Sequence, residues 1–307
     1  MSGALTLGPV LFNWAPEVWR DFHFRMADEA PIDAAHIGEV VCLKRAPFLA
    51  PHLDTVAERY VRAGKQLVFS SLALVVNNRE AEAMRGLVDS GAAMIEANDV
   101  SLIPRLTGRP FIVGPTVNVY NEGTLAYMER LGATRVCLPP ELPRASLAAL
   151  SQSARSELEV LAFGRMPLAF SARCFHARAH GLSKDGCRFV CDADADGLGV
   201  DTLDGEPFLA INGTQVLSHA WVNLVTEAPD LVDLGIARFR LSPQTADMVA
   251  IARGFRAVLD GDLDAVAAAV MFTELAPGVP FANGFYRGDA GHLYLSRLGV
   301  GAGMIAG

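Results

Sequence analysis

The sequence predicts an α/β fold, a (β/α)8 TIM-barrel-like domain with a long cysteine-bearing insertion after the seventh strand. Eight short apolar or β-branched runs alternate with amphipathic stretches, the pattern of buried parallel strands connected by helices. The connection at about 164–235 is much longer than the others and contains three of the five cysteines, which is typical of a functional insertion. We expect one domain over residues 1–307, with the barrel at about 5–260 and a C-terminal segment at 261–307.

Each predicted strand is a short apolar run, and most predicted helices end at a glycine. Pro16 suits a first helical turn, and glycine follows the other helical stretches closely. The expected helices are Glu17–Asp28, Asp54–Ala63, Glu80–Ser90, Glu122–Leu131 and Thr245–Leu259. A further helical stretch is expected around Trp221–Thr226, and one helix with an irregular tail after Gly261. The expected strands are Leu5–Phe12, His36–Val41, Gln66–Ser71, Ala92–Ala97, Phe111–Val117, Arg135–Leu138, Leu158–Phe163 and Arg238–Leu241.

Composition and charge limit the classes of protein to which the chain can belong. Apolar residues make up 51% and charged residues 20%, which supports a large core and excludes a disordered chain. The net charge of −8 argues against nucleic acid as a partner. We expect no membrane span, because no apolar run approaches ~18 residues, and no secretory signal, because no basic residue precedes the first apolar run. A cytoplasmic location follows, in which cysteines serve as thiols or metal ligands rather than in disulfides.

Four cysteines form the most informative pattern in the sequence. Cys187 and Cys191 are four residues apart, Cys174 precedes them by thirteen residues, and Cys42 follows the second predicted strand. The loops after barrel strands meet at one face, so the insertion can bring its three thiols to Cys42. Four thiolates ligate either zinc or an iron–sulfur cluster. Because only one pair is closely spaced, the pattern favours a cluster over zinc, and basic neighbours such as Lys44 suit its negative charge.

Other motifs carry weaker signals. Cys137 lies between apolar neighbours in the sixth predicted strand, where we expect a buried small hydrophobe. The run Asp192–Gly197 resembles the opening of a calcium loop, but Leu203 occupies the position of the required Glu, so a solvated acidic turn is favoured. The glycines at 299 and 301 suggest a flexible end rather than a phosphate loop. Three carboxylates lie close to strand ends and are expected to be structural partners of Arg: Glu39, Glu96 and Glu141. No catalytic residue is assigned.

Several segments together resemble the collagenase-like peptidase family, peptidase U32, and within it the UbiV branch of oxygen-independent ubiquinone biosynthesis. They are LGPVLFNW, IGEVVCLKR, KQLVFSSLALV, FGRMPLAFSARCF, NGTQVLS and RLSPQ, with a weaker match at NGFYRG. The resemblance implies a [4Fe-4S] cluster bound by the cysteines of GEVVC and SARCF and by two more, four residues apart. These positions are Cys42, Cys174, Cys187 and Cys191. The acidic stretch after Cys191 departs from the more basic continuation expected there.

The resemblance also implies a function and a partner. Members of the UbiV branch pair with a homologous UbiU-like protein as a heterodimer, and the pair hydroxylates the aromatic ring of ubiquinone precursors without O2. Two alternatives stay open, a non-catalytic scaffold of that complex and a relative that hydroxylates RNA bases. The family name does not imply proteolysis here, since the chain has neither His-Glu-x-x-His nor Gly-x-Ser-x-Gly.

Overall fold

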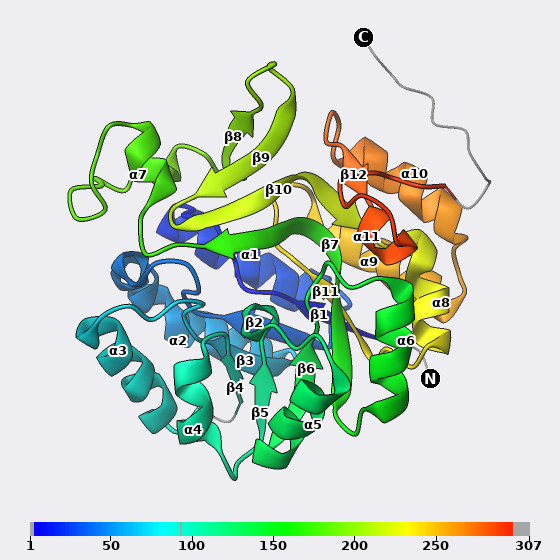
Figure 1. Cartoon of the computed structure of the whole chain (residues 1–307), viewed down its shortest axis with the longest axis horizontal. Helices are drawn as coiled ribbons and strands as arrows, with labels where there is room; N and C mark the ends of the chain where they lie inside the picture. Colours follow the sequence, from blue (N-terminus) through cyan, green and yellow to red (C-terminus); the bar gives the residue numbers. More distant parts are fainter. Residues whose placement is uncertain (1–2, 93, 297–307) are drawn as a thin grey trace.

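Eight parallel strands close into a barrel in the computed structural model, which describes residues 3–92 and 94–296 (Figure 1). These strands are β1 (Ala4–Leu7), β2 (Ala34–Ile37), β3 (Gln66–Ser70), β4 (Ile95–Ala97), β5 (Phe111–Val113), β6 (Ala133–Cys137), β7 (Glu157–Phe170) and β11 (Arg238–Leu241). Consecutive strands pair in parallel from β1 to β7, and β11 pairs with both β7 and β1. The predicted (β/α)8 barrel is therefore confirmed.

Strand β2 ends earlier than the sequence suggested. The predicted run continues to Val41, but the strand stops at Ile37. Gly38 follows with a φ of +118°, and a Cβ at this position would lie 2.8 Å from the carbonyl oxygen of Ser70. Only glycine adopts such a conformation in so little space, so the chain leaves the sheet here. The loop that results carries Cys42 beyond the carboxyl-terminal end of the strand.

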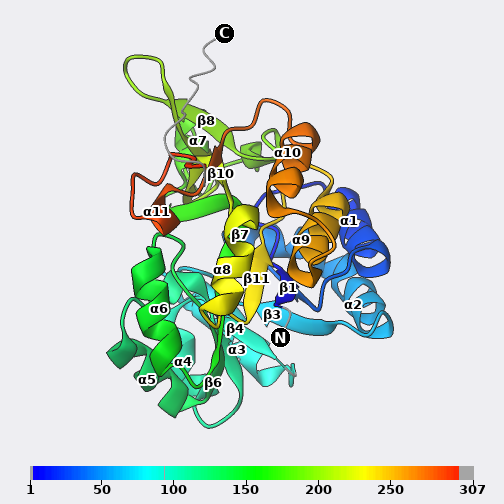
Figure 2. The same ribbon diagram turned by 90° about the vertical axis from the view of Figure 1, so that its right-hand side faces the viewer.

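Helices cover the outside of the barrel (Figures 1 and 2). They are α1 (Pro16–Glu29), α2 (Ala46–Arg62), α3 (Asn78–Asp89), α4 (Ile103–Leu106), α5 (Glu122–Leu131), α6 (Arg144–Ser153), α8 (Ala228–Asp233) and α9 (Met248–Asp260). Side chains of Asn77, Asn121 and Asp247 accept hydrogen bonds from backbone N–H groups in the first turns of α3, α5 and α9. The backbone N–H groups of the first helical turn have no carbonyl partner within the helix, and these side chains accept hydrogen bonds from them instead. The caps therefore fix where each helix begins.

The insertion after the seventh strand is built largely from antiparallel strands (Figure 1). Its elements are α7 (Phe175–Ala179), the 3-10 turn η4 (Val190–Asp192), β8 (Leu198–Asp201), β9 (Pro207–Asn212) and β10 (Gln215–Asn223). β7 continues past the barrel and pairs with β10, which pairs in turn with β9. The expected helix around Trp221–Thr226 is wrong, because Trp221 lies in β10, opposite Arg165 of β7.

The C-terminal segment contains more structure than the single predicted helix. It forms α10 (Ala265–Leu275), β12 (Phe281–Ala282), which pairs with β10, and α11 (Gly284–Arg287). Phe272 of α10 packs edge-on against Phe163 of β7, with ring centroids 5.6 Å apart. The paired aromatic rings attach this segment to the barrel wall. The glycines at 299 and 301 lie outside the described residues.

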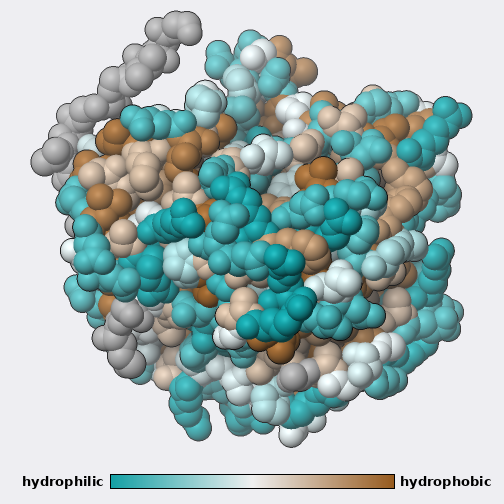
Figure 3. Space-filling view, turned by 180° about the vertical axis from the view of Figure 1, so that it is seen from behind, coloured by the Kyte–Doolittle hydropathy of each residue, from teal (hydrophilic) through white to brown (hydrophobic). Residues whose placement is uncertain are grey.

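The surface is mixed in polarity. Seen from behind, hydrophobic residues gather over α10, in the upper left of Figure 3. Val266 and Val270 of this helix are each more than half exposed. Among the helices that the structure describes, none has the length and apolar character needed to cross a membrane.

Candidate functional site

Two loops at the carboxyl-terminal end of the barrel position Cys42 and Cys174. Cys42 precedes the 3-10 turn η1 (Leu43–Arg45), and its backbone N–H donates to the Glu39 carboxylate at 2.9 Å. Glu39 also accepts from the N–H of Val41 at 2.7 Å. Cys174 caps α7, since its Sγ accepts from the N–H of Ala177 at 3.4 Å. Glu39 is thus a structural carboxylate, as predicted, but its partners are backbone N–H groups of the cysteine loop.

All four cysteines singled out from the sequence line one cavity. Cys174, Cys187 and Cys191 are each less than 10% exposed, and Cys42 is half-buried. All four are free thiols. Among the described residues, no three His, Cys, Asp or Glu side chains are placed to hold a metal ion. The fold nonetheless gathers the thiols from segments far apart in sequence around a shared space.

Lys44 bridges the two loops that carry the thiols. Its Nζ donates to the carbonyl oxygens of Lys184 and Asp185 at 2.8 and 3.0 Å and lies 3.5 Å from Sγ of Cys187. The same ammonium group lies over the ring of Phe189, 5.7 Å from its centroid. A cation in this position attracts negative charge on the thiol sulfur and holds the two loops together.

Arg45 is a second cation beside the thiols, and it is almost completely buried. Its guanidinium donates to the side-chain oxygen of Asn212 at 2.6 Å and to the carbonyl oxygen of Leu11 at 3.3 Å. The Cys191 thiol lies close enough to interact electrostatically with this guanidinium. Burial raises the pKa of the Cys42 and Cys191 thiols, and Arg45 opposes that rise. A buried cation among thiols favours a negatively charged group in the cavity.

The acidic turn after Cys191 has protein partners. Asp194 lies 2.9 Å from Nε2 of the buried His176, and Asp196 accepts a hydrogen bond from the N–H of Thr245 at 3.0 Å. The ring of His176 stacks on that of His180. The Asp196–Thr245 contact fastens the insertion to the loop after β11, and the His176 contacts hold the turn to α7. The acidic turn was expected to be solvated, but two of its carboxylates have protein partners.

A second cavity opens at the mouth of the barrel. Its lining comes from seven barrel strands and the loops after them, and it is mainly apolar: Gly8, Pro9, Leu11, Val40, Asn98, Pro115, Thr116, Cys137, Pro140, Leu161, Pro167, Phe170, Arg240 and Ser242. Val40 is two residues from Cys42, and Phe170 is four residues before Cys174. The mouth cavity and the cysteine cavity are therefore connected by short stretches of chain.

Cys137 lies apart from the other four cysteines. It is 1% exposed and lines the mouth cavity, where burial raises the pKa of its thiol well above the usual value. The prediction of a buried residue is confirmed. Its position beside Arg240 at the barrel mouth was not foreseen.

A buried polar layer lies at the base of the mouth cavity. Arg240 donates to Glu159 at 2.6 Å and to Glu96 at 2.5 Å, and His36 and Ser70 also contact Glu96, at 3.2 and 2.6 Å. Burial alone would raise the pKa of Glu96, but Arg240 and His36 hold it well below its usual value. Glu96 is thus a structural partner of an Arg, as predicted.

Sequence reasoning missed Arg240 as a site residue. The available signal was a pair of charged residues inside an apolar strand, in the run Arg238–Leu241. The third predicted carboxylate, Glu141, accepts a hydrogen bond from the hydroxyl of Tyr120. Both residues line an open, more polar hollow that shares Thr116 and Phe170 with the mouth cavity.

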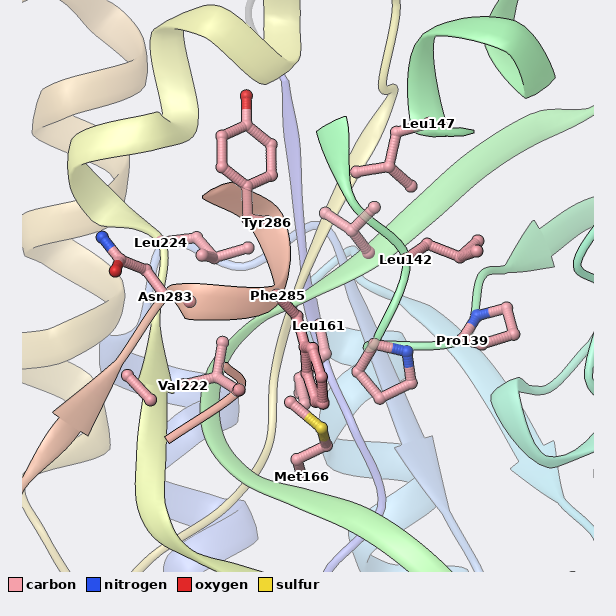
Figure 4. Close-up of a pocket in the computed structure, with 15 residues that line it drawn as sticks. Pro139, Leu142, Leu147, Leu161, Met166, Val222, Leu224, Asn283, Phe285 and Tyr286 are labelled. Atoms are coloured by element: carbon pink, nitrogen blue, oxygen red, sulfur yellow. The ribbon is translucent and has the colours of Figure 1, made fainter. Parts of the chain in front are cut away.

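A third, apolar cavity lies beside β7 and beneath α11 (Figure 4). Phe285 of the C-terminal segment extends toward Leu161 and Met166 in this view. Leu161 also lines the mouth cavity, so the two spaces adjoin. The cavity contains no charged side chain, and the cysteines do not contribute to it.

Three solved structures are distantly similar to this chain. The tryptophan synthase complex of Pyrococcus furiosus is 10% identical, with 89% of this chain and 95% of that chain covered and a TM-score of 0.42. Tryptophan synthase of Mycobacterium tuberculosis is 11% identical, with coverages of 90% and 94% and a TM-score of 0.39. An archaeal Rubisco is 13% identical, with coverages of 91% and 62% and a TM-score of 0.42. Similarity at this level gives no information on function.

Comparison with protein families, by contrast, identifies the family of this chain. The model of peptidase family U32 matches residues 22–292, which include the barrel from α1 onward, the insertion and most of the C-terminal segment. The match covers all four cysteines of the shared cavity and both cations beside them. The chain belongs to peptidase family U32.

Proposed function

We propose that the chain is the iron–sulfur subunit of an O2-independent hydroxylase that acts on the aromatic ring of ubiquinone precursors. One observation carries the proposal: four cysteines, from segments more than 130 residues apart, line the same cavity beside two cations. Cys42, Cys174, Cys187 and Cys191 would hold a [4Fe-4S] cluster there. The family match agrees with this function, and the resemblance to the UbiV branch specifies it.

The residues of the cavity suit a cluster. Only Cys187 and Cys191 form a close pair and the other two thiols are dispersed, a spacing that favours a cluster over the two close pairs common in structural zinc sites. Arg45 and Lys44 supply positive charge against the net negative charge of such a group, and Glu39 holds the backbone of the Cys42 loop. A cluster with four thiolate ligands supplies electron transfer or structural support, because no iron is left open to a substrate.

The proposal includes a partner and a substrate. The partner is a UbiU-like homologue in a heterodimer, and the substrate is an aromatic ubiquinone precursor. The apolar mouth cavity beside the cysteine site supports an aromatic substrate, since such rings bind in concave, mostly apolar spaces. The net charge of −8 supports this substrate over RNA, whose phosphates need basic contacts.

Iron and acid-labile sulfide in anaerobically purified protein test the cofactor. We expect about four of each per chain; zinc in place of iron would refute the cluster. Deletion of the gene tests the pathway, because cells grown without oxygen should then lack ubiquinone. Normal ubiquinone in those cells would refute the pathway while leaving the cluster measurement intact.

A catalytic subunit and a scaffold are separated by reconstitution. The heterodimer would be assembled with this chain in wild-type form or with a folded Cys174→Ala variant. We expect hydroxylation only with the wild-type chain. Full activity of the complex with the variant would assign this chain a scaffold role.

A further inference from the structure

We propose that Lys44 is a positioning residue for electron transfer, whose ammonium group holds the Cys187 loop and raises the reduction potential of the cluster through a hydrogen bond to Sγ of Cys187. The inference rests on the proposed function, since it concerns the group that the four cysteines would hold. It goes beyond that function by assigning the electron affinity of this group to a side chain that is not a ligand.

The ammonium group of Lys44 has a full set of acceptors in the insertion. An ammonium has three N–H donors and is strongly hydrated, so it leaves water readily only where each donor finds a partner. Nζ of Lys44 donates to the carbonyl oxygens of Lys184 and Asp185 at 2.8 and 3.0 Å and lies 3.5 Å from Sγ of Cys187. The two carbonyls therefore leave one N–H for the sulfur of a proposed ligand.

The positive charge of Lys44 has no carboxylate close by. None of the ion pairs within the part of the chain that the structure describes includes Lys44, whereas Lys184 in the opposite loop pairs with Glu80 at 4.0 Å. Arg45 also differs, because Glu39 lies close enough to interact with its charge. Lys44 therefore carries a charge that a negative group on the thiol sulfurs would offset.

Two aromatic rings cover this ammonium group. Nζ of Lys44 lies 5.7 Å from the centroid of the Phe189 ring, and Phe48 packs edge-on against Phe189 with centroids 4.8 Å apart. Arg188 and Phe189 have φ values of +49° and +57°, a left-handed backbone that is strained in residues other than glycine. The contacts of Lys44 help to hold this strained segment in place. Because the rings exclude water, the charge acts on the sulfur with less screening than in solvent.

A donor at a ligand sulfur favours the reduced state of a cluster. Reduction adds one electron and makes the cluster more negative, so a positive charge and an N–H donor stabilise the reduced state more than the oxidised one. Hydrogen bonds to the sulfurs are one of the factors that set the potentials of iron–sulfur clusters. Lys44 therefore raises the potential, and its removal lowers it.

An anaerobic redox titration of the full chain tests the proposal. Dithionite supplies the electrons and is oxidised to sulfite as each cluster gains one electron, and EPR spectra report the reduced fraction at each potential. We expect Lys44→Met to disfavour reduction about tenfold, which for a one-electron couple lowers the midpoint potential by about 59 mV. Lys44→Arg keeps a positive charge and N–H donors, so it should retain most of the wild-type potential.

Lys65→Met is the matched control. Nζ of Lys65 also donates to two backbone carbonyl oxygens, those of Ala30 and Ile32, but Lys65 precedes β3 at the opposite end of the barrel. Its replacement removes the same charge and similar contacts without affecting a thiol, so the potential should not change. An equal decrease in Lys44→Met and Lys65→Met would overturn the proposal, because net charge rather than the contact with sulfur would then be the cause.

A second neutral variant and the iron content keep the proposal testable. Lys44→Gln, which keeps an N–H donor, should show a smaller decrease in the same direction and replaces Lys44→Met if that variant does not fold. If the neutral variants fold but retain too little iron for titration, Lys44→Arg should retain its iron, and equal loss in all three would overturn the proposal. Iron-loaded Lys44→Met with the wild-type potential would overturn this inference alone. Wild-type protein without iron would overturn the proposed function and this inference with it.

Discussion

Cys42 and Cys137 have the same side chain but different surroundings. Cys42 lies in a loop beside Arg45, in the cavity that three other thiols share. Cys137 is enclosed in β6 and lines the mouth cavity, away from those thiols. Only their positions distinguish Cys42, a proposed ligand, from Cys137, a packing residue. The five cysteines of the chain therefore have identical side chains and can be compared directly by mutagenesis.

Replacement of each cysteine by alanine tests the proposed ligands. We expect Cys42→Ala, Cys174→Ala, Cys187→Ala and Cys191→Ala each to lose most of the bound iron, because each removes a thiolate that no neighbour replaces. Cys137→Ala should retain the iron and lose about 1 kcal/mol of unfolding free energy, the cost of a small buried side chain. Iron content and urea denaturation measure these effects.

The contrast between variants decides the assignment. If Cys137→Ala loses as much iron as Cys174→Ala, the choice of four cysteines from five is wrong. If all five variants keep their iron, the cysteines do not hold it.

At the scale of elements, the hairpin of β9 and β10 connects the insertion to the barrel loops. Gly213 in its turn has a φ of +67°, and a Cβ there would lie 2.4 Å from Nη2 of Arg45. The adjacent Thr214 donates its hydroxyl to the carbonyl oxygen of Val41 at 2.9 Å. The hairpin thus holds Arg45 and the Cys42 loop in place.

Gly213→Ala should destabilise the chain by about 2–4 kcal/mol, because the left-handed backbone is strained and the methyl group displaces a buried guanidinium. Gly205→Ala is the matched control. Gly205 lies in the hairpin of β8 and β9 with a φ of +85°, but no atom lies within 4 Å of its would-be Cβ. Its cost should be about 1 kcal/mol, from strain alone. Equal losses for the two variants in urea denaturation would exclude the contact with Arg45 as the cause.

At the scale of the whole molecule, a buried histidine couples stability to pH. His23 of α1 is fully buried, its Nδ1 lies 2.9 Å from the hydroxyl of Tyr60 in α2, and its Nε2 has no partner within the described residues. Burial lowers the pKa of His23 to about 3. The folded chain therefore keeps this ring neutral at pH values where the unfolded chain, with a pKa of about 6.5, takes up a proton.

The sign of the effect follows from this difference. The contribution of the neutral His23 ring to the free energy of unfolding is complete above pH 6.5. It is lost as the pH falls toward 3, because the unfolded chain takes up a proton on His23 and the folded chain does not. Between pH 6.5 and 4.5 we expect His23 to lower the free energy of unfolding by about 2.5 kcal/mol. His23→Phe should remove this part of the decline in urea denaturation, whereas replacement of the exposed His292 by Gln should not. An unchanged decline in His23→Phe would contradict the assignment.

The amino-acid sequence by itself determined the barrel and the set of thiols. Most barrel strands are local apolar runs, and α5 (Glu122–Leu131) was predicted to the residue. Gly132 marks its end in the sequence, and the structure shows that Asn121 caps its start. Cys174, Cys187 and Cys191 were recognisable by spacing, which is also a local property. Signals of this kind act within a few residues and need no knowledge of the rest of the chain.

Tertiary structure decided what those local signals leave open. Gly38 ends β2 because of the neighbouring Ser70 backbone, and Trp221 joins a strand because β7 and β12 are available as partners. Arg240 meets Glu159 and Glu96 across 81 and 144 positions of sequence. Closure of the barrel brings such groups together, and no local periodicity encodes which charge will meet which. The cysteine cavity and the mouth cavity exist for the same reason, since their walls come from loops that become neighbours only when β11 pairs with β1.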